Sequence, residues 1–141
     1  MPATAARPYE TKTLGAATDA VAPDGTAVRL LLSLAGGRMA HFELSAGGVS
    51  HAVTHRTVEE IWFVVSGRGE IWRSHDGVER IEPLGPGTSL TIPLGTAFQF
   101  RADAAGSALA FVAITMPPWP GMEEALPARG PWTPTVAAGC A

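Results

Sequence analysis

The sequence predicts an all-β single domain, built as a β-sandwich or a β-barrel. Short segments of strand-like composition follow one another closely, and glycine, proline or Asp-Gly pairs separate them. The chain has 141 residues, which suits one domain with a core that needs no disulfides. Hydrophobic residues make up 46% and charged residues 16% of it, as in a compact globular protein.

The candidate elements follow in chain order. Residues 1–26 are small and polar and include the turn sequence APDGT, so they predict an N-terminal arm. Residues 27–116 predict the barrel, and residues 117–141 a proline-rich tail, containing Trp119 and Trp132, packed on the barrel. Within the tail only residues 122–126 have helical tendency. The predicted strands are 27–35, 38–45, 49–55, 60–65, 70–74, 78–84, 88–93, 97–102 and 109–115.

Alternation along a strand assigns side chains to faces. His51, Val53 and His55 share one face of residues 49–55. In residues 60–65, Glu60, Trp62 and Val64 share one face and Ile61, Phe63 and Val65 the other. Both faces are apolar except at Glu60, which predicts burial on both sides and favours a homodimer. By the same alternation His41 faces solvent.

Charge and termini limit the partners and the location. The net charge is −3 and the ten basic residues are scattered, which argues against nucleic acid and membrane surfaces as partners. Cys140 is the only cysteine, so no disulfide forms within the chain. Because the N-terminus lacks a signal-peptide pattern, we expect a cytoplasmic protein. The uncharged run 104–122 has the length of a membrane span, but glycine and prolines interrupt it, so its segment ALAFVAIT predicts a buried strand.

Two motifs resemble those of the cupin superfamily. The first consists of Gly47, Val53-Thr54-His55, Glu60 and Gly67 at the family spacing. The second consists of Gly87, Pro93 and Gly95, with Phe98 and Ala102 where the family has histidine and asparagine. The resemblance spans residues 47–102 and implies a small single-domain cupin, a jelly-roll β-barrel.

The resemblance also implies a metal site, but the sequence departs from it. Metal-binding cupins use two histidines and a glutamate of the first motif and a histidine of the second. This chain keeps His55 and Glu60 and has Val53 and Phe98 at the other positions. His51 would have to take the place of the missing first-motif histidine. The four strand residues from His51 to His55 span about 13 Å, which is too long for both side chains to reach one ion easily. We therefore expect no cofactor; the alternative is a divalent transition metal bound by His51, His55 and Glu60.

An apolar pocket holding an imidazole and a carboxyl is suited to proton transfer. His55 and Glu60 are the candidate catalytic residues. The expected pocket lining is His51, Val53, Trp62, Phe98 and Phe100. The sequence thus predicts a metal-independent isomerase, epimerase, lyase or cyclase for a small organic substrate, and the apolar lining favours resemblance to polyketide cyclases. A metal-dependent dioxygenase or lyase and a non-catalytic binding protein remain as alternatives.

Overall fold

A computed structural model of the protein describes residues 8–121 and 123–140. These residues form eleven strands and no helix, hence no helix that could cross a membrane. The strands are β1 (Ala20–Val21), β2 (Ala27–Leu34), β3 (Gly37–Leu44), β4 (Val53–His55), β5 (Glu59–Ser66), β6 (Gly69–His75), β7 (Val78–Leu84), β8 (Ser89–Ile92), β9 (Ala97–Ala102), β10 (Leu109–Met116) and β11 (Ala125–Pro127).

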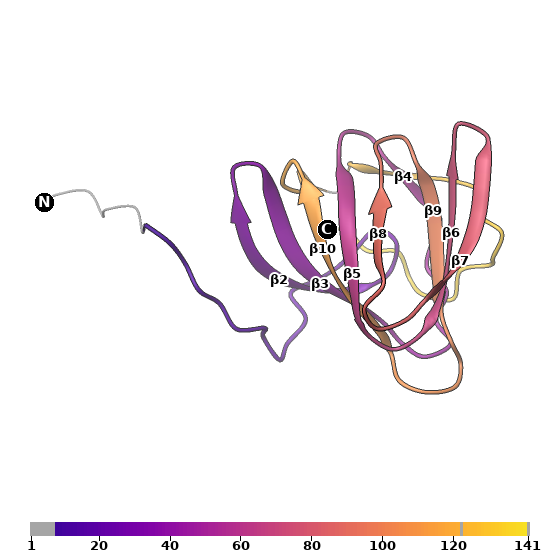
Figure 1. The fold of residues 1–141 in the computed structure, drawn as a ribbon, viewed down its shortest axis with the longest axis horizontal. Coiled ribbons are helices and arrows are strands. Elements are labelled where there is room, and N and C mark those ends of the chain that lie inside the picture. The colour runs from indigo at the N-terminus through magenta and orange to yellow at the C-terminus, as the bar shows by residue number, and fades with distance from the viewer. Residues whose placement is uncertain (1–7, 122, 141) are drawn as a thin grey trace, which may run out of the picture.

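The strands form two facing antiparallel sheets, which makes the molecule a jelly roll (Figure 1). The first sheet has the order β1-β2-β3-β10-β5-β8 and the second the order β11-β4-β9-β6-β7. Neighbours in each sheet are often far apart in sequence, as β3 and β10 are. The predicted all-β class and jelly roll are therefore confirmed.

The strand predictions missed β1, which lies in the predicted N-terminal arm, and they differ from the structure in two further segments. The predicted strand 49–55 is regular only at Val53–His55, preceded by an isolated bridge between Val49 and Arg101. The helical tendency expected for residues 122–126 was wrong where the structure describes them, because Ala125–Pro127 forms β11 and pairs with β4. Hydrogen bonding of this segment to the edge strand β4 outweighs its weak intrinsic preference for a helix. Residue 122 lies outside the described residues.

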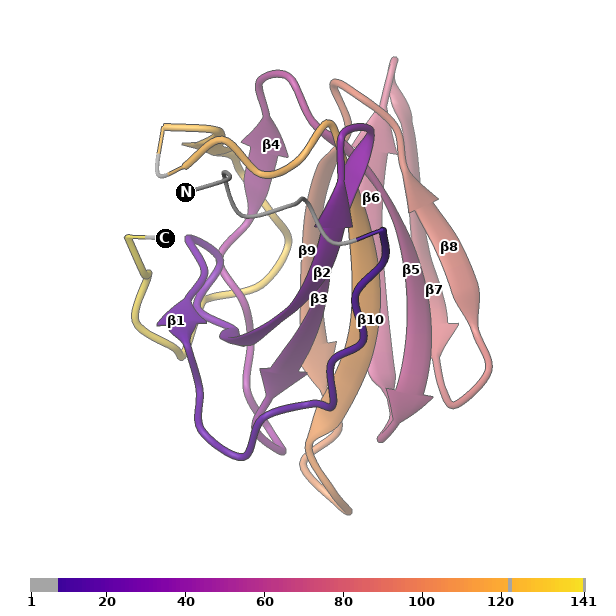
Figure 2. The same cartoon turned by 90° about the vertical axis from the view of Figure 1, so that its left-hand side faces the viewer.

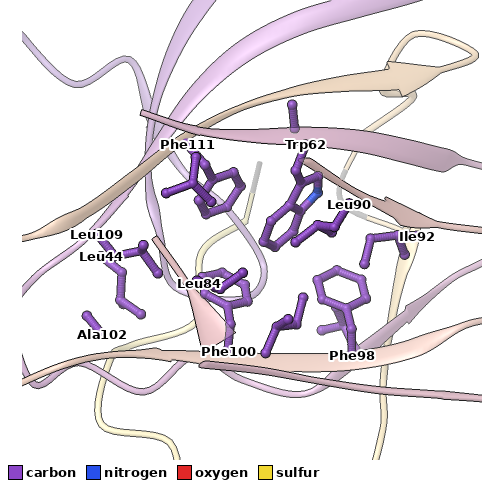
Figure 3. Packing of buried hydrophobic residues seen from close by; sticks show 14 residues of the cluster. Leu44, Trp62, Leu84, Leu90, Ile92, Phe98, Phe100, Ala102, Leu109 and Phe111 are labelled. Carbon is purple, nitrogen blue, oxygen red and sulfur yellow. The ribbon is translucent and has the colours of Figure 1, made fainter. Parts of the chain in front are cut away.

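Aromatic rings fill the space between the sheets (Figure 3). Trp62 on β5 stacks on Phe111 of β10 with ring centroids 3.8 Å apart. Phe98 and Phe100 of β9 meet the Trp62 ring edge-on from the opposite sheet. Because these four rings touch across the sandwich, they hold the two sheets in register.

The outer face of β5 is exposed within the single chain. Ile61, Phe63 and Val65 are 44, 50 and 44% exposed, so the expectation that both faces are buried fails for one subunit. His41 on β3 is instead buried, contrary to its predicted solvent-facing position. It lies opposite Arg29 in the β2–β3 pair and Val112 in the β3–β10 pair, whose side chains flank it on both sides.

The tight corners explain the glycines of both motifs. Gly67 has a φ of 78°, and a Cβ there would lie 2.2 Å from the carbonyl oxygen of Ala108. Gly95 has a φ of 86° in the turn between β8 and β9. Residues with a side chain rarely adopt such angles, so the spacing reflects barrel corners and does not depend on a metal.

The last residues of the chain return to the start of the barrel. Figure 2 shows the C-terminal segment beside β1 and β4. Backbone hydrogen bonds join Gly139 N to Ala22 O and Ala128 N to Ala52 O. The tail thereby covers the end of the sandwich where β4 lies.

Candidate functional site

A cavity of about 370 Å³ opens between the two sheets beside the aromatic core. Alanines and large apolar side chains form most of its wall, from both sheets and from the tail. Five polar side chains also reach it, which makes it an apolar pocket with few convergent polar groups, the usual form of a small-molecule site. Those five are Asp24, Arg38, His55, Glu60 and Thr115.

His55 and Glu60 lie against each other in this cavity. His55 Nδ1 is 3.0 Å from Glu60 Oε2, and each side chain is 6% exposed. The angle at this contact is not that of a hydrogen bond, so Nδ1 is a buried nitrogen held only by the nearby carboxylate. The indole Nε1 of Trp62 donates to Glu60 Oε1 at 2.9 Å. One Glu60 oxygen therefore accepts the Trp62 indole N–H, and the other lies against the His55 ring.

Asp24 contributes a second carboxyl group. It follows β1, and its Oδ1 accepts hydrogen bonds from the Thr26 backbone N–H at 3.0 Å and hydroxyl at 2.6 Å. Burial raises the pKa of Asp24 above its usual value, although these hydrogen bonds and His55 act in the other direction. Because Glu60 is close enough to raise it further, Asp24 favours its protonated form more than an ordinary aspartate.

The tail closes one side of the cavity. Trp119 meets the His55 ring edge-on with centroids 5.0 Å apart, and Phe98 does so from another side at 5.2 Å. Glu124 is buried and accepts hydrogen bonds from Thr57 N, Thr57 Oγ1 and Val58 N. These residues belong to the loop that joins His55 to Glu60, so Glu124 ties the tail to the segment that carries the site.

Glu124 therefore makes a testable contribution to stability. Burial by itself raises the pKa of Glu124, but the hydrogen bonds from Thr57 and Val58, together with His55, lower it below its usual value. A lowered pKa in the folded state stabilises the protein above the unfolded pKa, and the benefit disappears as pH falls through the folded pKa. Glu124→Gln should lower the free energy of unfolding by about 1–3 kcal/mol at pH 7.

Urea unfolding of wild type and variant at pH 7 and at about pH 3 measures this effect, and the difference should shrink at the lower pH. Glu123→Gln is the matched control, because Glu123 is an exposed neighbour. Equal losses for the two variants at pH 7 would show that the Glu124 contacts do not stabilise the fold.

The structure separates the residues that the sequence grouped as pocket lining. Val53 and Trp62 line the cavity with His55 and Glu60. Phe98 contacts His55 but lies in the core behind the wall, and Phe100 is fully buried beneath Trp62. His51 is absent from the lining, and its Nε2 lies 2.6 Å from the Val136 carbonyl oxygen, against the tail. Alternation fails for His51 because residues 50–52 are not a regular strand.

The side chains do not fit a metal. Among the described residues no three His, Cys, Asp or Glu side chains gather closely enough to hold an ion. Val53 and Phe98 stand where the implied ligands would be, and His51 is turned away. Glu60 Oε1 accepts the Trp62 indole N–H, and Glu60 Oε2 lies 3.0 Å from His55 Nδ1.

The cavity residues that were not predicted include three polar side chains, Asp24, Arg38 and Thr115, and the aromatic Trp119. For two of them a signal exists in the sequence. Arg38 has the same parity as Ala40 and Phe42 on the inward face of β3, and Thr115 has the parity of Phe111 on β10. A charged or polar residue on a core face indicates a site. Asp24 lies in what reads as an ordinary turn, and Trp119 in the tail.

Solved structures provide the comparison. A tryptophan-to-phenylalanine variant of oxalate decarboxylase from B. subtilis superposes with a TM-score of 0.71 at 13% identity, over 88% of this chain and 34% of that one. KdgF from Halomonas sp. gives 0.56 at 19% identity, over 66 and 81% of the two chains. A histidine-to-glutamine variant of Streptomyces PAC13 with uridine gives 0.62 at 13%, over 79 and 85%.

The chain has the cupin fold. No protein family and no curated protein matches it by sequence. The chain spans about a third of the length of oxalate decarboxylase, at 34%. With identities this low, the likeness concerns the cupin fold alone.

Proposed function

We propose that the protein is a metal-independent enzyme that moves a proton on a small, largely apolar, carbonyl-containing molecule. The observation that supports this most directly is the His55–Glu60 contact inside an apolar cavity, with Glu60 held by Trp62. A histidine with a buried carboxylate at one ring nitrogen and a cavity at the other has the arrangement of a general base. Isomerase, lyase and cyclase reactions on carbonyl compounds often begin with such a transfer.

The proposed roles follow from the contacts. His55 Nε2 removes a proton from the carbon next to the substrate carbonyl. Glu60 is a positioning residue, because it contacts His55 Nδ1 and stabilises the positive charge that the ring acquires. Trp62 donates to the other Glu60 oxygen and so fixes the carboxylate. The surrounding aromatic rings keep water from competing for the proton.

Asp24 is the candidate acid. It lines the same cavity, and burial raises its pKa, which favours the protonated form needed to donate to the substrate oxygen or to the leaving group. A base and an acid whose environments differ in this way can act at two points of one bound molecule. The outcome is then double-bond migration, elimination or ring closure, depending on the substrate.

We also propose a homodimer. Ile61 and Phe63 on β5 are exposed, and Ile114 on β10 lies between Ile61 and Met39 in the sheet register. Exposed apolar side chains on adjacent strands form a flat patch of the kind that two copies cover about a two-fold axis. A cytoplasmic location stays a prediction.

Native mass spectrometry of the protein, purified without chelators, tests these proposals together. We expect a dimer mass, no stoichiometric transition metal, and a small organic ligand that is converted on incubation. A stoichiometric metal whose removal abolishes conversion would overturn the metal-independent mechanism. A ligand that is released chemically unchanged would favour a binding protein, and a monomer mass would overturn the dimer.

A further inference from the structure

One cation in the cavity is unused by the proposed proton transfer. Arg38 lies at the start of β3, is half-buried and lines the cavity. Within the described part of the chain its side chain forms no hydrogen bond or ion pair, whereas the other half-buried arginines, at 29, 73 and 101, each pair with a glutamate. An arginine that faces an apolar cavity without a carboxylate partner is a recognition group for an anion.

The sheet register places Arg38 relative to the reacting groups. Thr115 on β10 pairs with Arg38 on one side and with Glu60 on the other. All three side chains line the cavity, so they form one row across three adjacent strands. Neighbouring strands lie about 4.8 Å apart, which puts the Arg38 and Glu60 backbones about 10 Å apart. A small molecule can therefore reach Arg38 and His55 at the same time.

The charges of the lining select the kind of anion. Arg38 is the one Lys or Arg among the described residues that line the cavity, and Asp24 and Glu60 are both carboxyl groups there. A phosphate carries nearly two negative charges, which the single Arg38 cation would not balance beside the carboxyl groups of Asp24 and Glu60. A carboxylate carries one charge and matches the planar guanidinium fork with two parallel hydrogen bonds.

We propose that Arg38 binds the carboxylate of an apolar organic acid, which defines the substrate class of the site. The carboxylate lies at Arg38 and Thr115, the apolar body lies over Ala40 and Trp62, and the reacting carbon lies near His55. The proposal rests on the proposed function only for this last point; binding of the acid at Arg38 is independent of any turnover.

Calorimetric titration with matched acids and amides tests the proposal. The probes are phenylacetate, 3-phenylpropionate and 4-phenylbutyrate, each beside its uncharged primary amide of nearly the same shape. Wild type should bind at least one acid about tenfold or more tightly than its amide, which is the preference expected of a charge-assisted hydrogen bond. Arg38→Gln should remove this preference, and Arg38→Lys should retain part of it because the charge stays while the fork is lost.

Arg80→Gln is the control, because Arg80 is exposed on β7 and away from the cavity. Equal affinities for acid and amide, loss of the preference in Arg80→Gln as well, or no saturable binding of any acid would overturn the proposal. His55→Gln should still bind the acid, so a failure of the proposed chemistry leaves an Arg38-dependent preference intact. Turnover that depends on His55 but not on Arg38 would support the proposed enzyme function and would overturn the proposal that the substrate is an organic acid bound by Arg38.

Discussion

Replacing His55 by glutamine should lower kcat by about 10²–10⁴-fold, because this removes the only group proposed to accept the substrate proton. Glutamine is close to imidazole in size, so the packing of residue 55 against Trp119 and Phe98 should be kept. The measurement is turnover of the ligand identified by mass spectrometry, with circular dichroism to show that the variant is folded. His51→Gln is the control, because His51 lies against Val136 and outside the cavity.

Glu60→Gln tests the positioning role separately. It keeps an acceptor for Trp62 and removes the negative charge beside His55. We expect kcat to fall with little change in KM, because Glu60 acts through His55 and not on the substrate. The double variant should be little slower than His55→Gln alone, since groups that work as a unit are not additive. Unchanged kcat in both single variants would rule out this mechanism.

Removal of the Trp62 side chain should cause the largest loss of stability, about 3–5 kcal/mol for Trp62→Ala. Trp62 is 1% exposed, stacks on Phe111 and meets Phe98 and Phe100 edge-on. Its loss leaves a large cavity between the sheets and strips Glu60 of its indole donor. Urea unfolding followed by circular dichroism measures the change in the free energy of unfolding.

Trp62→Phe separates packing from the hydrogen bond and remains informative if the alanine variant does not fold. Phenylalanine keeps a ring against Phe111 but leaves one Glu60 oxygen without its donor, so we expect a loss of about 1–3 kcal/mol. Trp132→Ala is the control, since Trp132 is half-exposed in the tail. If Trp62→Ala lowers the free energy of unfolding no more than Trp132→Ala does, the packing of Trp62 against the other core rings does not stabilise the fold as predicted.

The strands of the barrel were predictable because their signals are local. The Asp76-Gly77 pair, one of the Asp-Gly signals between predicted strands, has positive φ at both residues and joins β6 to β7. Residues 97–102 were predicted as a strand and form β9 within the same bounds. The strands β1 and β11 were missed because they have two and three residues, too few for alternation to be visible. Their extended form comes from pairing with β2 and β4.

The site could be predicted only in part. His55 and Glu60 are five positions apart in one motif, and the parity of their strands turns both inward. Asp24 and Trp119 lie toward the two ends of the chain, and nothing in the neighbouring sequence marks either as part of the cavity that holds His55. The position of His51 depends on the Val136 carbonyl, which is 85 residues away.

The amino-acid sequence by itself determined the longer β-strands of the barrel, the glycine corners and the inward direction of His55 and Glu60, because these depend on neighbours within a few residues. Only the tertiary structure decided which distant groups complete the cavity: Asp24 before the barrel, Arg38 and Thr115 across β3 and β10, and Trp119 from the tail. The physical reason is that long-range strand pairing and burial set these contacts, and both depend on the whole chain being folded.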